Sequence, residues 1–305
     1  MKSGRVSGVI TVRYRMKTAG MSTVTEELSD SQKTALITLL TDDDPAVFQT
    51  VRNRILAQGP NATDWLRPHT ISRDPALRRR AQDIVLHFDR MEADNRFLAF
   101  CLQQGQDCDL EQGAWLLAQT RFPDINVEGY KAMIDSYASD LVERIDFSAT
   151  ANQIIATLND YLFGELGYVG NEENYYDPDN SFLNRVIDRR TGNPIILCLL
   201  FMLVTRRLSL PVTGIGLPGH FICRYQTSAA EIYIDPFSRG KLMKKVDCIN
   251  YLLQANYSVK DDYLAPVRPR RMLLRICKNL HQIYRHQHQD AEAMRLQRYE
   301  AVLSR

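Results

Sequence analysis

The sequence predicts an α+β protein in which one central helix packs on a small antiparallel sheet, with helical segments before and after this core. Three observations carry this prediction. A strongly apolar run begins at Asn193-Pro194, short β-rich runs separated by turn residues follow it, and amphipathic helical patterns fill the first half and the end of the chain. An apolar helix and a meander with one apolar face bury their apolar surfaces by packing against each other.

The composition is that of an ordinary soluble globular protein. The chain has 305 residues, of which 45% are hydrophobic and 24% are charged, which leaves room for more than one domain. A formal net charge of +2 does not indicate a nucleic-acid partner, because such domains usually carry a basic stripe and a high pI. The most apolar segment, 194–204, is too short to span a bilayer, so no membrane association is expected.

The cysteine pattern indicates a reducing, cytoplasmic setting. The six cysteines are scattered and form no CxxC pair, and several lie within apolar runs. Residues 1–30 are predicted to form a flexible tail. The first 25 residues are basic and contain no acid, which imitates a transit peptide, and Met21 is an alternative start.

The N-terminal third contains a repeated helix start. Asp44-Pro45 returns thirty residues later as Asp74-Pro75, and apolar residues follow each at helical spacing. Residues 31–92 are therefore predicted to form a pair of HEAT-like helical repeats, although chance similarity of two helix starts is the alternative. Residues 93–148 are predicted to be a helical connecting region.

The remaining elements can be placed in chain order. Residues 167–181, rich in Gly, Asn, Asp, Tyr and Pro, are predicted to form a long ordered loop, and loops of that length are often functional. The central helix is expected to start at Pro194, with Asn193 as its cap, and to end near Leu208. Three strands are predicted over Val212–Leu217, His220–Gln226 and Glu231–Asp235.

The C-terminal residues 266–305 are predicted to form two helices broken near His286–Asp290, a tetratricopeptide-like helix pair. Cys277 and His281 share a helix face, but His288 lies beyond the helix end, and two ligands do not make a metal site. No phosphate loop, HExxH or Rossmann glycine pattern is present. Neither a metal nor an organic cofactor is therefore expected.

Several unusual short motifs in fixed order carry a family resemblance over roughly residues 149–265. These motifs are Asn180-Ser181-Phe182-Leu183-Asn184, Arg189-Arg190-Thr191-Gly192-Asn193-Pro194, Leu210-Pro211-Val212, Gly216-Leu217-Pro218-Gly219-His220-Phe221 and Ile234-Asp235-Pro236-Phe237. With them the sequence resembles the transglutaminase-like core superfamily, and closely its bacterial Sir B regulator-type subgroup. The resemblance implies a transglutaminase/papain-like core for this region, and a role in regulation or protein assembly.

The resemblance also implies a catalytic triad, of which this chain has two members. Catalytic members of the superfamily open the central helix with a cysteine, where the helix N-terminus lowers the thiol pKa. His220 matches the histidine that shares its proton, and Asp235 matches the aspartate that orients that histidine. The cysteine position falls at or next to Pro194, so no nucleophile is present there.

The other candidate nucleophiles of this region are Cys198, Cys223, Ser181 and Thr191. Cys198 lies one helical turn beyond Pro194 and is the alternative nucleophile, but its leucine neighbours favour core packing, where a thiol pKa rises. Cys223 is predicted to face away from His220. Ser181 and Thr191 precede the helix without a pattern that would activate a hydroxyl.

The function predicted from these residues is that of a non-catalytic, regulatory or protein-interaction module. Its degenerate cleft would bind a protein or peptide partner, with His220 and Asp235 as binding or structural remnants of the triad. One alternative is a cysteine-dependent hydrolase or acyltransferase that uses Cys198 with His220 and Asp235. Another is a helical adaptor in which the core is only a spacer. The predicted binding residues are Asn180, Ser181, Gly192, Asn193, Pro194, Gly219, His220 and Asp235.

Overall fold

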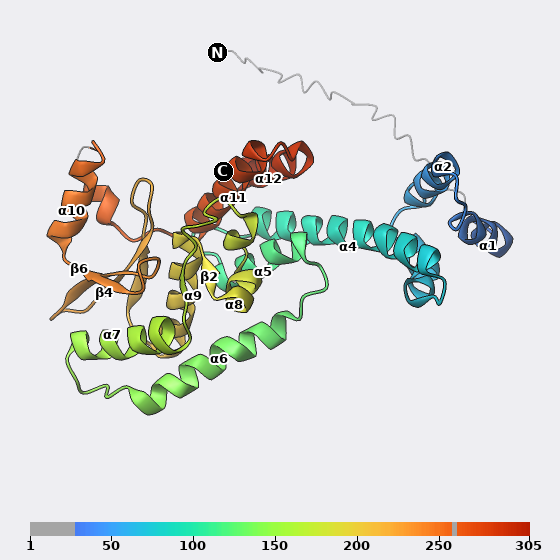
Figure 1. The fold of residues 1–305 in the computed structure, drawn as a ribbon. Helices are drawn as coiled ribbons and strands as arrows, with labels where there is room; N and C mark the ends of the chain where they lie inside the picture. Colours follow the sequence, from blue (N-terminus) through green and yellow to red (C-terminus); the bar gives the residue numbers. More distant parts are fainter. Residues whose placement is uncertain (1–27, 258–260) are drawn as a thin grey trace, which may run out of the picture. The chain divides into compact units, whose positions relative to one another are not determined.

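A computed structural model describes residues 28–257 and 261–305 and shows the predicted α+β architecture (Figure 1). Most of the tail predicted at 1–30 lies outside the described residues. The chain divides into two compact units, one that ends at Val85 and one that spans Leu86–Arg305. The boundary predicted between residues 92 and 93 falls inside a single long helix, α4 (Pro75–Gln103).

The first unit is helical, and its helix starts are set by the two Asp-Pro motifs. The carboxylate of Asp44 accepts the Ala46 N–H at 2.8 Å, and that of Asp74 accepts the Ala76 N–H at 2.8 Å. A short polar side chain at the cap satisfies an N–H that the helix leaves unpaired. The helices of this unit are α1 (Asp30–Leu39), α2 (Pro45–Leu56), α3 (Ala62–Leu66), the 3₁₀ helix η1 (Arg67–Ile71) and the first part of α4.

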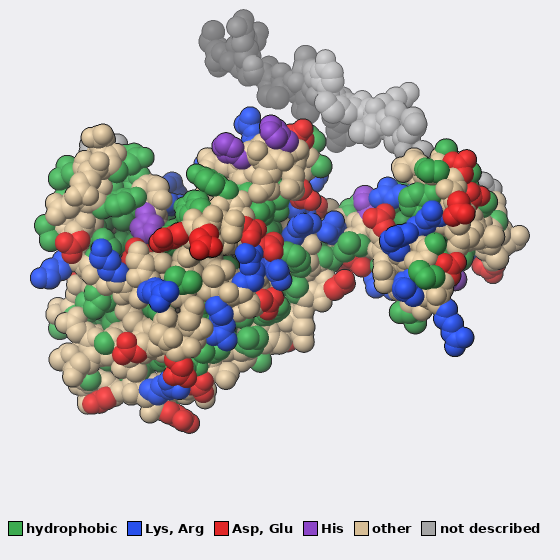
Figure 2. Space-filling view, viewed as in Figure 1, with side chains coloured by type: hydrophobic (Ala, Val, Ile, Leu, Met, Phe, Trp, Pro, Cys, Tyr) green, Lys and Arg blue, Asp and Glu red, His purple; other side chains and the backbone are tan. Residues whose placement is uncertain are grey.

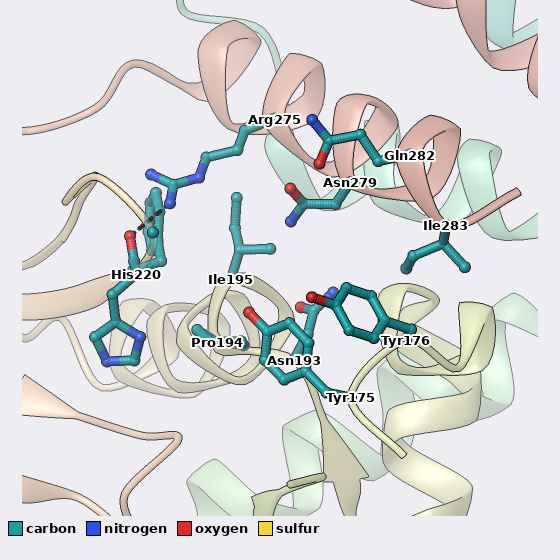
Figure 3. Close-up of a pocket in the computed structure, with 12 residues that line it drawn as sticks. Tyr175, Tyr176, Asn193, Pro194, Ile195, His220, Arg275, Asn279, Gln282 and Ile283 are labelled. Carbon is teal, nitrogen blue, oxygen red and sulfur yellow. Dashed lines mark hydrogen bonds between the residues drawn. The ribbon is translucent and has the colours of Figure 1, made fainter. Parts of the chain in front are cut away.

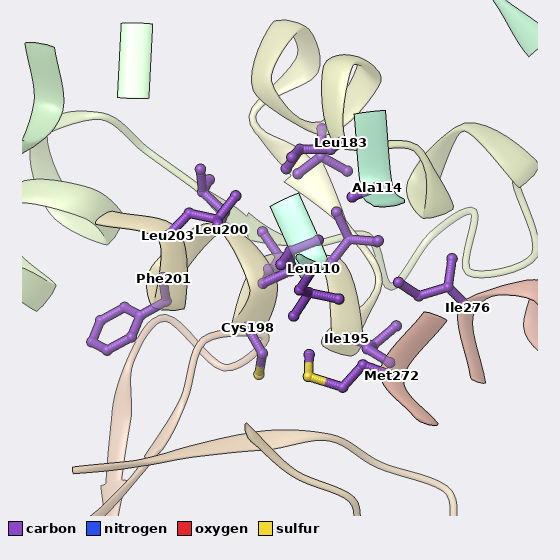
Figure 4. Packing of buried hydrophobic residues seen from close by; sticks show 14 of the residues in the cluster. Leu110, Ala114, Leu183, Ile195, Cys198, Leu200, Phe201, Leu203, Met272 and Ile276 are labelled. Carbon is purple, nitrogen blue, oxygen red and sulfur yellow. The ribbon is translucent and has the colours of Figure 1, made fainter. Parts of the chain in front are cut away.

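The second unit is built around helix α9 (Pro194–Arg207), the predicted central helix. Almost every residue from Pro194 to Thr205 is buried, which is typical of a helix that is apolar on all sides. One side of α9 packs on strands β3 and β4, and other sides contact α6, α8 and α11. Figure 4 shows Ile195, Cys198 and Leu203 of α9 in this shared core, with Ile195 beside Met272 of α11.

The sheet is an antiparallel meander of four strands in the order β3-β4-β5-β6. The first three strands are those that the sequence predicts, the first two shorter and the third with the predicted bounds, and the fourth is not predicted. Cys223 of β4 faces α9, because its thiol lies 3.6 Å from the Cys198 carbonyl oxygen. The opposite face packs on α10 through a second apolar cluster. The elements here are β3 (Val212–Ile215), β4 (Ile222–Gln226), β5 (Glu231–Asp235), β6 (Lys241–Met243) and α10 (Lys245–Gln254).

Helices on both sides of this core complete the second unit. The C-terminal pair breaks where the sequence predicts and is formed by α11 (Pro269–His286) and α12 (Asp290–Leu303). Among the described residues, no helix is both long and apolar enough to cross a membrane. The other elements are α5 (Leu110–Arg121), α6 (Val127–Arg144), α7 (Ala151–Asn159), the π-helix η2 (Asp160–Glu165), β1 (Val169–Gly170), η3 (Pro178–Ser181), α8 (Leu183–Arg189), β2 (Thr191–Gly192) and η4 (Asp261–Leu264).

Candidate functional site

A pocket of about 310 Å³ opens where the start of α9 meets the turn before β4 and one face of α11. Figure 2 shows the surface hollowed between the lobe that carries α10 and the lobe of the C-terminal helices. Figure 3 shows its interior, where polar side chains of α11 face Tyr175 and Tyr176 across the start of α9. The lining residues are Tyr175, Tyr176, Asn193, Pro194, Ile195, Gly219, His220, Phe221, Arg275, Asn279, Gln282 and Ile283.

His220 and Asp235 form the hydrogen-bonded pair that the resemblance implies. Nε2 of His220 lies 2.9 Å from Oδ2 of Asp235, and the two side chains are 18% and 9% exposed. His220 lies in the turn before β4, after Gly219, whose φ of 73° favours a residue without Cβ. With Nε2 held by the carboxylate, Nδ1 is the ring nitrogen left to face the pocket, on the side of Pro194 in Figure 3.

Asp235 is held by more than the histidine. Its Oδ1 accepts the Phe237 and Ser238 N–H groups at 3.1 and 3.3 Å, and its Oδ2 accepts the Ser238 hydroxyl at 2.9 Å. Burial alone would raise the pKa of Asp235, but the hydrogen bonds from His220 and Ser238 outweigh it and lower the pKa below 3.8. The charged carboxylate therefore stabilises the fold at neutral pH, and this contribution is lost as the pH falls through the lowered pKa.

The start of α9 is intact although the superfamily's cysteine is missing. Oδ1 of Asn193 accepts the Ile196 N–H at 3.1 Å, and its Nδ2 donates to the Ser181 hydroxyl at 2.8 Å. Pro194 occupies the first helical position, where its missing N–H costs nothing. The helix start at which the resemblance expects a nucleophile is thus formed and capped, and Pro194 is the first residue of that helix.

Asn180 fixes the loop that covers this helix start. Its side-chain nitrogen donates to the carbonyls of Asn174 and Tyr175 at 2.8 and 3.3 Å, and its oxygen accepts from Asn171 at 2.9 Å. Its backbone carbonyl accepts the Asn193 N–H at 3.1 Å. One buried amide thereby ties the long loop to α9 and sets the position of the two tyrosines.

The structure gathers only part of the predicted binding set at the pocket wall. Asn193, Pro194, Gly219 and His220 line the pocket, and Asp235 lies directly behind His220. The other three predicted residues do not line it. Asn180 and Ser181 are 1% exposed and act through the loop and the cap, while Gly192 packs against Val186, which a Cβ would meet at 2.9 Å.

Cys198 is placed in the core and does not line the pocket. Its thiol donates to the Phe221 carbonyl at 3.4 Å. Burial raises its pKa well above the ordinary value, because an apolar environment disfavours the thiolate. Ser181 is engaged with Asn193, and Thr191 pairs with Val169 in the small parallel β1–β2 ladder.

The α11 wall of the pocket was not predicted. Arg275, Asn279 and Gln282 recur at the spacing of one helix face, and Figure 3 shows them opposite Tyr175 and Tyr176. The i, i+4, i+7 pattern of polar residues on an otherwise amphipathic helix was the available signal. Nothing in the sequence alone shows that this face returns to the start of α9.

Comparison with known proteins agrees with this geometry. Residues 128–278 match the profile of the transglutaminase-like superfamily, and this range contains the start of α9, His220 and Asp235. No solved structure matches the chain.

Relatives occur in bacteria and mammals. A UPF0162 protein of Xylella fastidiosa is 36% identical over 56% of this chain and 63% of its own length, so the chain spans less than two thirds of that relative. A UPF0162 protein of Pseudomonas aeruginosa is 26% identical over 60% of this chain and 67% of its own length. The human F-box only protein 21 is 28% identical over 57% of this chain and 32% of its own length.

Proposed function

We propose that this protein is a non-catalytic, transglutaminase-like interaction module of the Sir B regulator type, which binds a peptide segment of a cytoplasmic partner in the pocket at the start of α9. The observation that carries the proposal is Pro194. This residue lines the pocket together with His220 and opens α9, and the resemblance places the catalytic cysteine at or next to it. The HEAT-like and tetratricopeptide-like helices would serve as the scaffold for the partner.

The architecture of the pocket supports binding of an extended segment. One wall is aromatic, the opposite wall carries the amides of Asn279 and Gln282, and the floor is the apolar Ile195. Amides offer both donors and acceptors to a peptide backbone, while aromatic rings offer apolar area at low entropic cost. The loop that bears Tyr175 and Tyr176 is tied down by Asn180, so this wall is formed before any ligand arrives.

The location of the thiols supports the absence of cysteine chemistry. All six cysteines are buried and none lines the pocket. Burial raises the pKa of Cys101 to about 12 and that of Cys248 to about 11, and it raises the pKa values of Cys108, Cys198 and Cys277 as well. A thiolate that could act with His220 is disfavoured at neutral pH.

Iodoacetamide labelling of the native protein at neutral pH tests this proposal. We expect uniformly slow alkylation of all six cysteines, with complete alkylation only after unfolding in denaturant. Peptide mapping assigns any faster site. Rapid labelling of Cys198 that slows on His220→Ala would instead favour the hydrolase or acyltransferase alternative.

A further inference from the structure

Arg275 places a positive charge in the pocket wall that no nearby carboxylate neutralises. One of its terminal nitrogens, Nη2, donates to the carbonyls of Leu217 and His220 at 2.8 and 2.6 Å, and the guanidinium lies over the Phe221 ring. Within the described part of the chain it forms no ion pair, and no Asp or Glu lines the pocket. Burial lowers the pKa of Arg275, which is the mark of a charge that has lost water without gaining a counter-ion.

Both carboxylate oxygens of Asp235 are occupied by hydrogen bonds to groups other than Arg275. Its two carboxylate oxygens are taken up by His220, by the Ser238 hydroxyl and by two backbone N–H groups. Asp235 therefore orients the His220 ring and stabilises the turn at Phe237 and Ser238, and it makes no contact with Arg275. The pocket keeps a net positive character, to which the N-terminus of α9 adds its partial charge.

Arg275 also has donors to spare. A guanidinium carries five N–H groups in a fixed fork, and its two carbonyl bonds leave Nε and Nη1 available. The bonds to the Leu217 and His220 carbonyls and the contact with the Phe221 ring hold the side chain in place. A guanidinium pairs with a carboxylate or a phosphate, but among the described residues no second Lys or Arg lines the pocket to balance a phosphate dianion, which favours a carboxylate.

Resting on the peptide-binding function above, we infer that the bound segment presents a carboxylate to Arg275. The carboxylate comes from an acidic side chain or from a peptide C-terminus, which share this chemistry. The flanking amides of Asn279 and Gln282 hold the neighbouring peptide group, and the tyrosines cover the apolar part of the ligand.

Titration with small matched probes, followed by NMR shifts of pocket residues, tests the inference. The probes are the N-methylamides of N-acetylglutamate and N-acetylglutamine, which differ only in charge, and N-acetylalanine, which carries a C-terminal carboxylate. We expect at least one acid to bind about tenfold more tightly than the glutamine probe, and to lose this advantage at high salt. Whichever acid binds identifies the source of the carboxylate.

Variants separate the charge of Arg275 from its structural role. Arg275→Gln and Arg275→Lys both remove the guanidinium that donates to the Leu217 and His220 carbonyls, but only Arg275→Gln removes the positive charge. We expect Arg275→Gln to abolish the preference for acid and Arg275→Lys to retain part of it, while Arg271→Gln, exposed on the same helix and outside the pocket lining, leaves it unchanged. If neither the glutamate probe nor N-acetylalanine bound more tightly than the glutamine probe, the inference would be overturned and the peptide-binding proposal would stand. Absence of binding by any acid would overturn the inference alone, because capture of longer peptides judges the proposal separately.

Discussion

A cysteine introduced in place of Pro194 is expected to become a reactive thiol of low pKa. The substituted residue would lie at the first turn of α9, at the positive end of the helix and in the same pocket as Nδ1 of His220. Thiols in such positions have pKa values of roughly 3.5–7.5, against about 8.5 for a free cysteine. The pH dependence of iodoacetamide labelling of Pro194→Cys reports this pKa directly.

A second cysteine variant, with its thiol outside the pocket lining, provides the reference pKa. Met294→Cys places a thiol on the outside of α12, where the native side chain is 61% exposed. We expect the labelling midpoint of Pro194→Cys to lie about one pH unit or more below that of the control. Adding His220→Ala should move the midpoint back toward the control. Identical midpoints for both single variants would mean that the start of α9 does not preserve the electrostatics of a nucleophile site.

Replacing Asn193 with alanine is expected to be the most destabilising single change at the site. The side chain caps α9 and also donates to the buried Ser181 hydroxyl. Its loss removes a cap and leaves a buried polar partner without its bond, which together cost about 2–3 kcal/mol of the free energy of unfolding. Urea denaturation followed by circular dichroism measures the change.

Asn126 provides the comparison for this prediction. It caps α6 by accepting the Gly129 N–H at 3.0 Å, but it is exposed and has no second buried partner. We expect Asn126→Ala to cost about 1 kcal/mol. Ser181→Ala added to Asn193→Ala should recover part of the loss, because it removes the orphaned hydroxyl. Equal losses for Asn193→Ala and Asn126→Ala would show that the link to Ser181 contributes nothing.

Much of the core could be predicted because its signals are local. Asn193-Pro194 contains both a cap and a first-turn proline, and the two Asp-Pro motifs place the starts of α2 and α4. The meander follows from turn residues between β-rich runs. The resemblance to transglutaminases then supplied the pairing of His220 with Asp235, which the hydrogen bond at 2.9 Å agrees with.

What could not be predicted depends on contacts between distant parts of the chain. Strand β6 is short and half-exposed, so its pattern is weak, and α8 is only a few residues long. Arg275 comes close to His220 only because α11 packs back onto α9. Asn180 looked like a ligand-binding residue, yet its amide holds the backbone of the loop, a role that depends on how residues 171–181 fold.

The most direct test of the central claim is peptide capture by a pocket-filled variant. Gln282 lines the pocket but is exposed, so Gln282→Trp should fill the opening without disturbing the core, and Met294→Trp is the control. Wild-type protein and both variants are incubated with an immobilised peptide array, and bound peptides are then analysed by mass. We expect the wild type and Met294→Trp to retain the same peptides at unchanged mass, and Gln282→Trp to lose them at least about tenfold, because a bulky ring excludes the ligand. Peptides that bind equally to Gln282→Trp, or that are recovered cleaved or acyl-transferred, would contradict a non-catalytic binding pocket.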